Sequence, residues 1–309
     1  MITSVFKKST PINYSLLGLL LVIFFLIYQV KHTQSPVSIE ILFQKGAMLV
    51  LLFSSLFFSN FIVKKNNLTK KSSYTILFYF LFVLIFPEVL NDFKLLLSNL
   101  FVLLAMRRLV SLQSLKAPKE KIFDASLWIF VASIFNFWCI LFLFLVYISI
   151  IFHVSRDYRN WLLPIIAFFT ALILFIFYAL LFDKAIVMHY IHSDSTAFEL
   201  DYFKNDSQNI AFSVYVVCVL FFSIPSIFSL TNKPLNLQAS YKKVIFATLI
   251  GIVLFVTSFP KNNQLLIFTF LPLAIMATNS IEYMQNKFQQ EMILWVTLIC
   301  SLVCFCIQL

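Results

Sequence analysis

Long apolar runs follow one another along almost the whole chain, and short polar gaps separate them. A bilayer core about 30 Å thick needs about 20 apolar residues in a helix, with a range of about 17–25. Most of the runs approach or reach this length, and they predict an all-α integral membrane protein, a polytopic bundle of nine to eleven transmembrane helices with eleven as the best count. The runs are 14–30, 47–63, 73–87, 94–106, 123–135, 137–153, 161–182, 210–230, 244–258, 265–279 and 292–307.

The fourth and fifth runs, 94–106 and 123–135, are shorter than a bilayer crossing. Their length fits two short transmembrane helices, a re-entrant pair of half-helices or one tilted hairpin. No gap is long enough for a soluble domain, so we expect residues 1–309 to form a single transmembrane domain. Two outer gaps are expected to contain short loop helices, near 36–45 and 184–209.

Positive charge alternates from gap to gap. Short loops rich in Lys and Arg stay in the cytoplasm. Counted from the N-terminus, one set of alternate gaps holds 17 of the 23 Lys and Arg and five of the 13 acids, while the other set holds six and eight. The first set therefore carries a net charge of +12 and the second −2. This partition predicts a cytoplasmic N-terminus, and eleven crossings then put the C-terminus outside.

Composition excludes a water-soluble fold. Hydrophobic residues make up 61% of the chain and charged residues 12%, and the mean hydropathy is +0.94; a soluble domain is roughly 45–50% apolar and about 25% charged. The net charge of +10 is spread over the gaps rather than gathered in one soluble block, so nucleic acid is not an expected partner. The partners expected instead are the lipid bilayer, anionic lipids and other membrane proteins.

Few features point to transport or to bound cofactors. Only three glycines occur in the chain, and the middles of the apolar runs hold no ionisable groups, whereas transporters use small residues, broken helices and buried charges. All five cysteines lie inside apolar runs without the spacing of a metal site, so we expect small core residues there. No cofactor is predicted.

Acidic residues of the outer gaps are candidates for chemistry at the membrane surface. Glu40 lies in the first outer gap, where a carboxylate close to the lipid surface has the chemistry of a general base; the alternative is a solvated acid. Glu88 and Asp92 form a second acidic corner. There Asp92 is a further catalytic candidate, and the alternative is a helix cap at the membrane boundary.

Two groups of basic residues are candidates for binding phosphate. On the outer side, Lys184, His189 and His192 with Asp194 suit a divalent metal or a phosphate, or else they are side chains that extend to the membrane surface. On the inner side, Arg107 and Arg108 lead a cluster that suits anionic lipid headgroups or a polyprenyl phosphate, or else it only sets the topology. The other members of this cluster are Lys116, Lys119 and Lys121.

Three segments carry a resemblance to a known family. Residues 6–13 (FKKSTPIN), 107–112 (RRLVSL) and 119–126 (KEKIFDAS) resemble an uncharacterised polytopic inner-membrane family of Bacteroidota, and the likeness spans most of the chain. The resemblance implies a bacterial inner membrane with the outer gaps in the periplasm, and it implies no known activity.

A second, architectural resemblance concerns the order of segments. A short acidic outer loop, a pair of short helices with a basic inner turn, and then residues 159–164 (RNWLLP) and 270–274 (FLPLA) are similar to GT-C membrane glycosyltransferases. The resemblance implies a polyprenyl-phosphate sugar donor, with Glu40 as the base and Lys184, His189 or His192 facing the donor phosphate. The chain departs from that pattern, because its loop holds one acid instead of a pair and it lacks a large periplasmic domain.

Three functional hypotheses remain open at this stage. The first is a multi-spanning inner-membrane protein of cell-envelope biogenesis, GT-C-like, that uses or binds a polyprenyl-phosphate-linked sugar. The second is a non-catalytic structural subunit of a secretion, motility or envelope-assembly complex, whose apolar helices pack against partner helices. The third is a transporter of a hydrophobic solute. Fold-level analogy does not decide between them.

Overall fold

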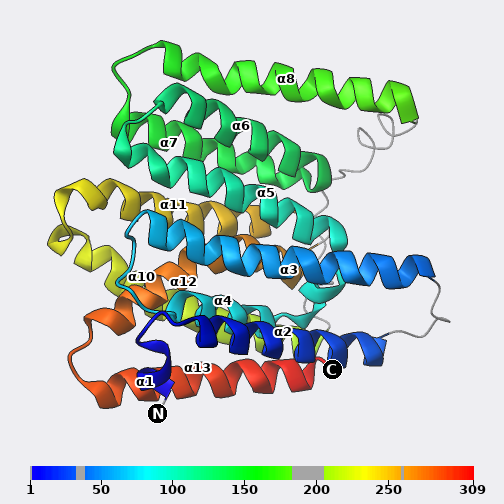
Figure 1. Ribbon diagram of the computed structural model, residues 1–309, viewed down its shortest axis with the longest axis vertical. Helices are drawn as coiled ribbons and strands as arrows, with labels where there is room; N and C mark the ends of the chain where they lie inside the picture. The colour runs from blue at the N-terminus through cyan, green and yellow to red at the C-terminus, as the bar shows by residue number, and fades with distance from the viewer. Residues whose placement is uncertain (1, 33–38, 183–204, 259–260) are drawn as a thin grey trace.

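The computed structural model describes residues 2–32, 39–182, 205–258 and 261–309, and these residues form helices joined by short turns (Figure 1). The α-helices are α1 Ile2–Phe6, α2 Pro11–His32, α3 Ile39–Lys65, α4 Tyr74–Ile85, α5 Phe93–Val110, α6 Pro118–Phe135, α7 Leu143–His153, α8 Arg159–Phe182, α10 Asp206–Phe228, α11 Leu235–Thr257, α12 Ile267–Tyr283 and α13 Lys287–Ile307. Short 3-10 helices are η1 Pro87–Asn91, η2 Ser111–Ser114, η3 Phe137–Phe142, η5 Ser229–Asn232 and η6 Asn263–Leu266. The described ranges contain no β-strand, so the predicted all-α architecture is confirmed.

Eight helical segments of the described chain are long and apolar enough to cross a membrane. Three further helices run beside them: α4 and the segment Phe137–His153 are shorter, and α6 carries several charged residues in its first two turns. The eight segments are Pro11–His32, Ile39–Lys65, Phe93–Ser114, Arg159–Leu181, Asp206–Asn232, Leu235–Thr257, Asn263–Tyr283 and Lys287–Ile307.

Several helices extend beyond the apolar runs that predict them. Residues 39–45, expected as a separate loop helix, are the first turns of α3, and α5 and α6 are each 18 residues long. At about 1.5 Å per residue each of the latter two is ~27 Å long. Charged residues such as Lys, Arg and Glu are good helix formers, so a helix continues past the end of its apolar run. Of the second expected loop helix, residues 184–204 lie outside the described residues and 206–209 open α10.

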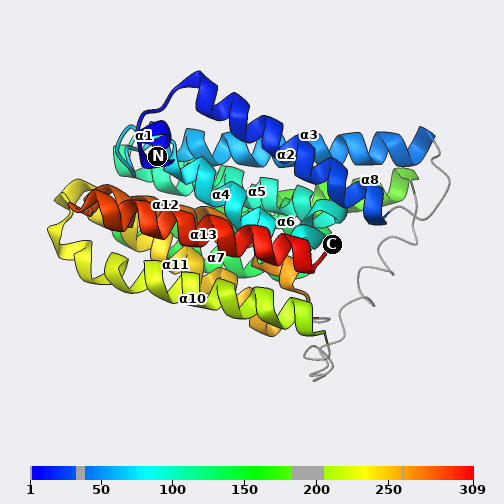
Figure 2. The same cartoon turned by 90° about the horizontal axis from the view of Figure 1, so that it is seen from below.

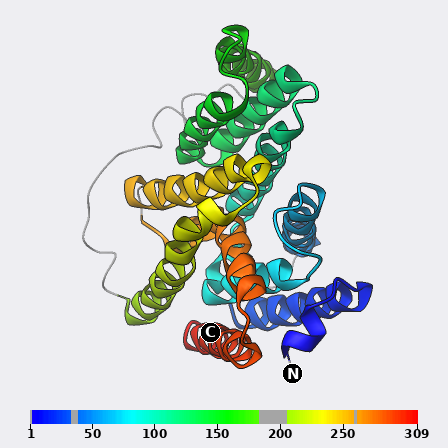
Figure 3. The ribbon, with the colours of Figure 1, turned by 90° about the vertical axis from the view of Figure 1, so that its left-hand side faces the viewer.

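The centre of the bundle is formed by α4 and α12 (Figure 3). Every residue of α4 is buried, and Phe82 and Phe86 meet Tyr215 of α10 with ring centroids 5.6 and 5.1 Å apart. The Tyr215 hydroxyl is 2.6 Å from the Thr269 hydroxyl at the start of α12, which satisfies a polar group in the apolar interior. Pro87 ends α4, because proline cannot continue a helical hydrogen-bond ladder.

The turns between helices gather at the two ends of the bundle (Figures 1 and 2). One end, called the basic end here, contains the turns 7–10, 66–73, 111–117, 154–158, 229–234 and 284–286. The 17 Lys and Arg of the more positive set lie in these turns or within about two helical turns of them. The opposite end contains the turns 86–92, 136 and 261–262 and the C-terminus. The alternation of charge along the sequence therefore becomes a separation of charge along the bundle.

Candidate functional site

The α5–α6 hairpin carries the basic cluster expected to bind phosphate. Arg108 in the last turn of α5 pairs with Asp124 of α6, with 2.7 Å between Nη2 and Oδ2. The Arg107 guanidinium lies over the Phe61 ring of α3, 4.9 Å from its centroid, and Lys121 Nζ donates to the Ser111 carbonyl at 2.7 Å. These side chains tie α5 to α3 and α6, and both arginines remain partly exposed.

Lys243 is a fully buried amine that lies two turns inside α11. The apolar run 244–258 predicts that Lys243 lies in the gap before a helix. This prediction is wrong, because α11 begins at Leu235, eight residues before Lys243. Its Nζ donates to the Leu109 carbonyl of α5 at 2.5 Å. The C-terminal end of a helix carries a partial negative charge, so the amine lies where a cation is favoured.

Lys233, in the turn between η5 and α11, is enclosed by aromatic rings. Only 7% of it is exposed, and its Nζ lies 3.6 Å from the ring centroid of Tyr283 and 4.6 Å from that of Tyr241. The Asn279 Oδ1 atom accepts from the amine at 3.4 Å. Ring faces attract a desolvated cation. Burial nevertheless lowers the pKa of Lys233 to about 8, and the Glu282 carboxylate opposes this shift.

Glu282, whose charge acts on this amine, bonds to a distant segment of the chain. Its carboxylate accepts from the Lys70 backbone N–H at 2.8 Å and from the Ser72 hydroxyl at 2.5 Å, and Lys70 Nζ donates to its main-chain carbonyl at 3.1 Å. The α3–α4 turn is thereby fixed to the end of α12. We call Lys70, Ser72, Lys233, Tyr241, Asn279, Glu282 and Tyr283 the Lys233–Glu282 cluster.

At the opposite end, the two acids of the predicted acidic corner bond to neighbouring segments of the chain. Glu88 accepts from Gln208 Nε2 at 2.5 Å and from Gln264 Nε2 at 3.3 Å, so it connects η1 with α10 and η6. Asp92 is the N-cap of α5, and its Oδ1 accepts from the Leu95 backbone N–H at 2.9 Å. Asp92 therefore has the capping geometry that the sequence offers as the alternative to a catalytic role.

Of the other predicted outer residues, only Glu40 belongs to the described chain. Glu40 is exposed in the first turn of α3, and no described residue bonds to its side chain. Lys184, His189, His192 and Asp194 lie outside the described residues. Among the residues that are described, no group of three His, Cys, Asp or Glu has the arrangement of a metal site.

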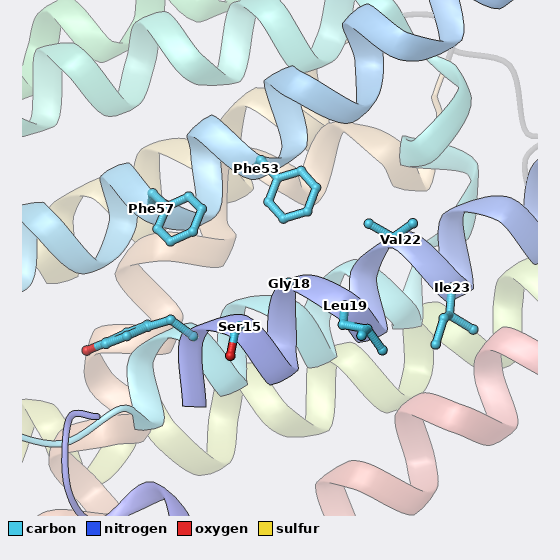
Figure 4. Close-up of a pocket in the computed structure, with 8 residues that line it drawn as sticks. Ser15, Gly18, Leu19, Val22, Ile23, Phe53 and Phe57 are labelled. Atoms are coloured by element: carbon cyan, nitrogen blue, oxygen red, sulfur yellow. The ribbon is translucent and has the colours of Figure 1, made fainter. Parts of the chain in front are cut away.

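A groove runs between α2 and α3 on the side of the bundle (Figure 4). It has a volume of about 430 Å³, and Phe53 and Phe57 project from α3 toward the turn of α2 that contains Gly18. At the basic end of the groove, Lys64 Nζ donates to the hydroxyls of Ser9 and Tyr14. The lining residues are Tyr14, Ser15, Gly18, Leu19, Val22, Ile23, Phe53 and Phe57.

Sequence reasoning missed the Lys233–Glu282 cluster and the groove. The members of the cluster come from the turn 66–73, the turn 229–234, α11 and the end of α12, so no local spacing marks them. For the groove there is one local signal, because Gly18 is one of only three glycines in the chain. A glycine in an otherwise bulky apolar run indicates close approach or open space at that position.

Comparison with known proteins identifies the family of the chain. No curated protein and no solved structure matches it. A family model described as a family of unknown function, DUF6427, matches residues 6–309, in agreement with the expectation that the family is an uncharacterised one. The chain belongs to the family of unknown function DUF6427.

Proposed function

We propose that this protein crosses the bacterial inner membrane eleven times, with its basic end in the cytoplasm and its C-terminus in the periplasm. The separation of charge between the two ends of the bundle supports this orientation, because Lys-rich and Arg-rich loops stay in the cytoplasm. The crossings are the eight long segments together with α4, α6 and the segment Phe137–His153. The packing of α4 and α12 at the centre supports α4 as a crossing shielded from lipid by its neighbours.

Within that membrane, the role we propose is that of a non-catalytic subunit of an assembly for cell-envelope biogenesis. One observation carries this proposal: the charged residues predicted as candidate sites, where described, mostly hold helices together. Glu88 binds two amides from distant segments, Asp92 caps α5, and Arg108 pairs with α6. A bundle fastened at both ends, with an apolar lateral surface, suits a scaffold for partner helices.

The helix best placed to meet a partner is α8, which lies at one edge of the bundle (Figures 1 and 3). Ala167 and Ala171 pack against Phe130 of α6 in a small cluster separate from the main core. Most of the other residues of α8 are exposed, with Ile173 and Phe177 63% and 61% exposed. A partner helix against this side would complete the packing of α8.

Site-specific photocrosslinking in living cells tests the proposal. Phe177 is replaced by a photoreactive phenylalanine, and Trp295, 48% exposed on α13, is replaced in the same way as the control on another helix. We expect one discrete adduct with a different protein from position 177 and lipid adducts alone from position 295. Lipid adducts alone from both positions, or an adduct only with a second copy of the chain, would contradict the role of a subunit.

An enzymatic role is the second candidate, and the exposed carboxylate of Glu40 at the start of α3 favours it. Here the protein would be a GT-C-like glycosyltransferase with Glu40 as general base toward an acceptor hydroxyl and a polyprenyl-phosphate sugar as donor. The test is Glu40→Gln, with Asp206→Asn as a matched exposed acid. Loss of envelope glycosylation with Glu40→Gln alone, at wild-type protein levels, would support the enzyme. Normal glycosylation with both variants would remove the catalytic role.

A further inference from the structure

The groove between α2 and α3 has the shape and lining of a site for an extended apolar chain. Its volume of about 430 Å³ falls within the range of roughly 300–1,000 Å³ that is usual for small-ligand sites. The lining follows α2 from Tyr14 to Ile23, which at about 1.5 Å per residue is ~14 Å along the helix. Apart from the Tyr14 and Ser15 hydroxyls the lining side chains are apolar.

Gly18 keeps the groove open. A Cβ atom at this position would lie 3.0 Å from Cε1 of the Phe53 ring, which is closer than ordinary van der Waals contact. Any larger side chain at position 18 would therefore push into the ring or fill the space between the helices. Gly46 of α3 differs in this respect, because a Cβ atom there meets nothing within 4 Å.

A cation lies at the basic end of the groove. Lys64 Nζ contacts the hydroxyls of Ser9 and Tyr14 and lies 4.7 Å from the Tyr14 ring centroid. Its partners among the described residues are thus hydroxyls and a ring, with no carboxylate within ion-pair distance. Lysine and two hydroxyls together supply one positive charge and several donors, which is the chemistry that binds a phosphate. The neighbouring Lys65 faces the Phe61 ring instead, at 5.3 Å.

We infer that this groove binds an anionic phospholipid, with one acyl chain along α2 and α3 and the headgroup phosphate at Lys64, Ser9 and Tyr14. The apolar lining suits the chain, and the uncompensated amine at one end suits the negative headgroup. Tyr14 connects the groove to the amine, because it lines the groove and its hydroxyl contacts Lys64. This inference does not depend on the role proposed above, since it concerns only the contacts of α2, α3 and the turn 7–10.

Native mass spectrometry of the purified full-length protein tests the site. Phosphatidylglycerol or zwitterionic phosphatidylcholine is added to lipid-depleted protein in detergent, and the affinity for the first bound lipid is measured. Gly18→Leu and Val22→Phe fill the groove, and Lys64→Gln removes the cation. The matched controls are Gly46→Leu, a glycine of α3 in open space, and Lys65→Gln, the adjacent lysine. Thermal unfolding verifies that each variant is folded, and Val22→Phe serves if Gly18→Leu does not fold.

We expect the wild type to prefer phosphatidylglycerol to phosphatidylcholine. Lys64→Gln should weaken phosphatidylglycerol binding about fivefold, as expected for one lysine near an anionic lipid, and the groove-filling variants should weaken the binding of both lipids. Both controls should bind like the wild type. Equal phosphatidylglycerol affinity in the wild type and the groove-filling variants would overturn the proposal. So would equal affinity of the wild type for the two lipids, or a second protein copy bound in place of a lipid.

Discussion

Lys233 and Lys243 are buried amines at the basic end, and the structure stabilises them in different ways. Lys243 donates to the last turn of α5 through the Leu109 carbonyl. Lys233 lies against the rings of Tyr241 and Tyr283. A buried charge costs several kcal/mol unless it is well paired, and neither amine forms an ion pair within the described residues. Only Lys233 lies in a turn outside the candidate membrane segments, so its protonation responds to the solution.

The pKa of Lys233 predicts how stability changes with pH. Burial lowers this pKa from 10.5 to about 8, so between these two values the unfolded chain binds more protons than the folded protein. The free energy of unfolding should therefore rise as pH increases from about 8 to 10.5, and the cost of the buried cation is fully present below about pH 8. The Lys233→Met variant should lack the part of this rise in the free energy of unfolding that comes from Lys233.

Thermal unfolding in detergent at a series of pH values measures this effect. The quantity to compare is the slope of melting temperature against pH for the wild type and for Lys233→Met, because tyrosines titrate in the same range in both proteins. Lys242→Met replaces an exposed lysine of α11 and should keep the wild-type slope. A slope in Lys233→Met equal to that of the wild type would show that Lys233 has the same pKa in the folded and unfolded chains.

At the scale of elements, α11 packs tightly against the start of α12 at Gly251. A Cβ atom on Gly251 would lie 2.4 Å from Cγ2 of Thr269, so even alanine cannot be accepted without a shift. Gly251→Ala should lower the free energy of unfolding by about 1–3 kcal/mol, the usual cost of overpacking a core. The helix propensity of alanine works in the opposite direction, by about 1 kcal/mol, and reduces the measured loss.

A second substitution separates this contact from other effects of the glycine. Thr269→Ser removes the methyl group but keeps the hydroxyl that bonds to Tyr215, so Gly251→Ala should be less harmful in a Thr269→Ser background. Gly46→Ala, in open space, should cause no loss. The wild type, Gly251→Ala, Thr269→Ser and the double variant form a double-mutant cycle. Thermal unfolding of these four proteins gives the coupling energy between positions 251 and 269. Coupling near zero would mean that Thr269 does not limit the approach of the two helices.

The sequence predicts the helices well but not where they begin and end. The apolar runs indicate the positions of the long segments, because a bilayer-length apolar run has few other structures open to it. The apolar part of α11 begins near Val244, whereas the helix begins at Leu235, and α3 likewise starts before its main run. Lys242 and Lys243 prolong α11 because lysine has high helix propensity. Counting apolar residues alone therefore places buried Lys243 outside its helix.

At the scale of the whole molecule, the candidate sites depend on contacts that the sequence does not encode locally. The charge partition is visible in sequence because the turns alternate between two ends of the bundle. The Lys233–Glu282 cluster is not, because Lys70 and Glu282 are 212 residues apart. For the same reason the two amides that bind Glu88 come from α10 and η6, which no spacing around Glu88 indicates. The groove depends on the relative placement of α2 and α3, which the sequence leaves open.

The eleven-crossing topology predicts which turns a membrane-impermeant reagent can reach. Single cysteines in a cysteine-free background are placed at Asn67, Leu115 and Tyr158 of the basic end, and at Gln34 and Asn262. In intact cells with a permeable outer membrane, we expect an impermeant maleimide to label positions 34 and 262 only. Positions 67, 115 and 158 should react after the inner membrane is opened. Labelling of position 67 from the periplasm would contradict the orientation.

Position 115 also decides between full crossings and a re-entrant pair for α5 and α6. If both helices cross, the turn 111–117 lies in water on the cytoplasmic side, and Leu115, which is 57% exposed, becomes reactive once the inner membrane is opened. A pair that enters and leaves from the periplasm would instead keep this turn within the bilayer, with the five basic residues of the hairpin in or near hydrocarbon. That arrangement costs about 2.5–3.5 kcal/mol for each charge at the bilayer centre. We therefore expect labelling of position 115 at a rate similar to that of position 67.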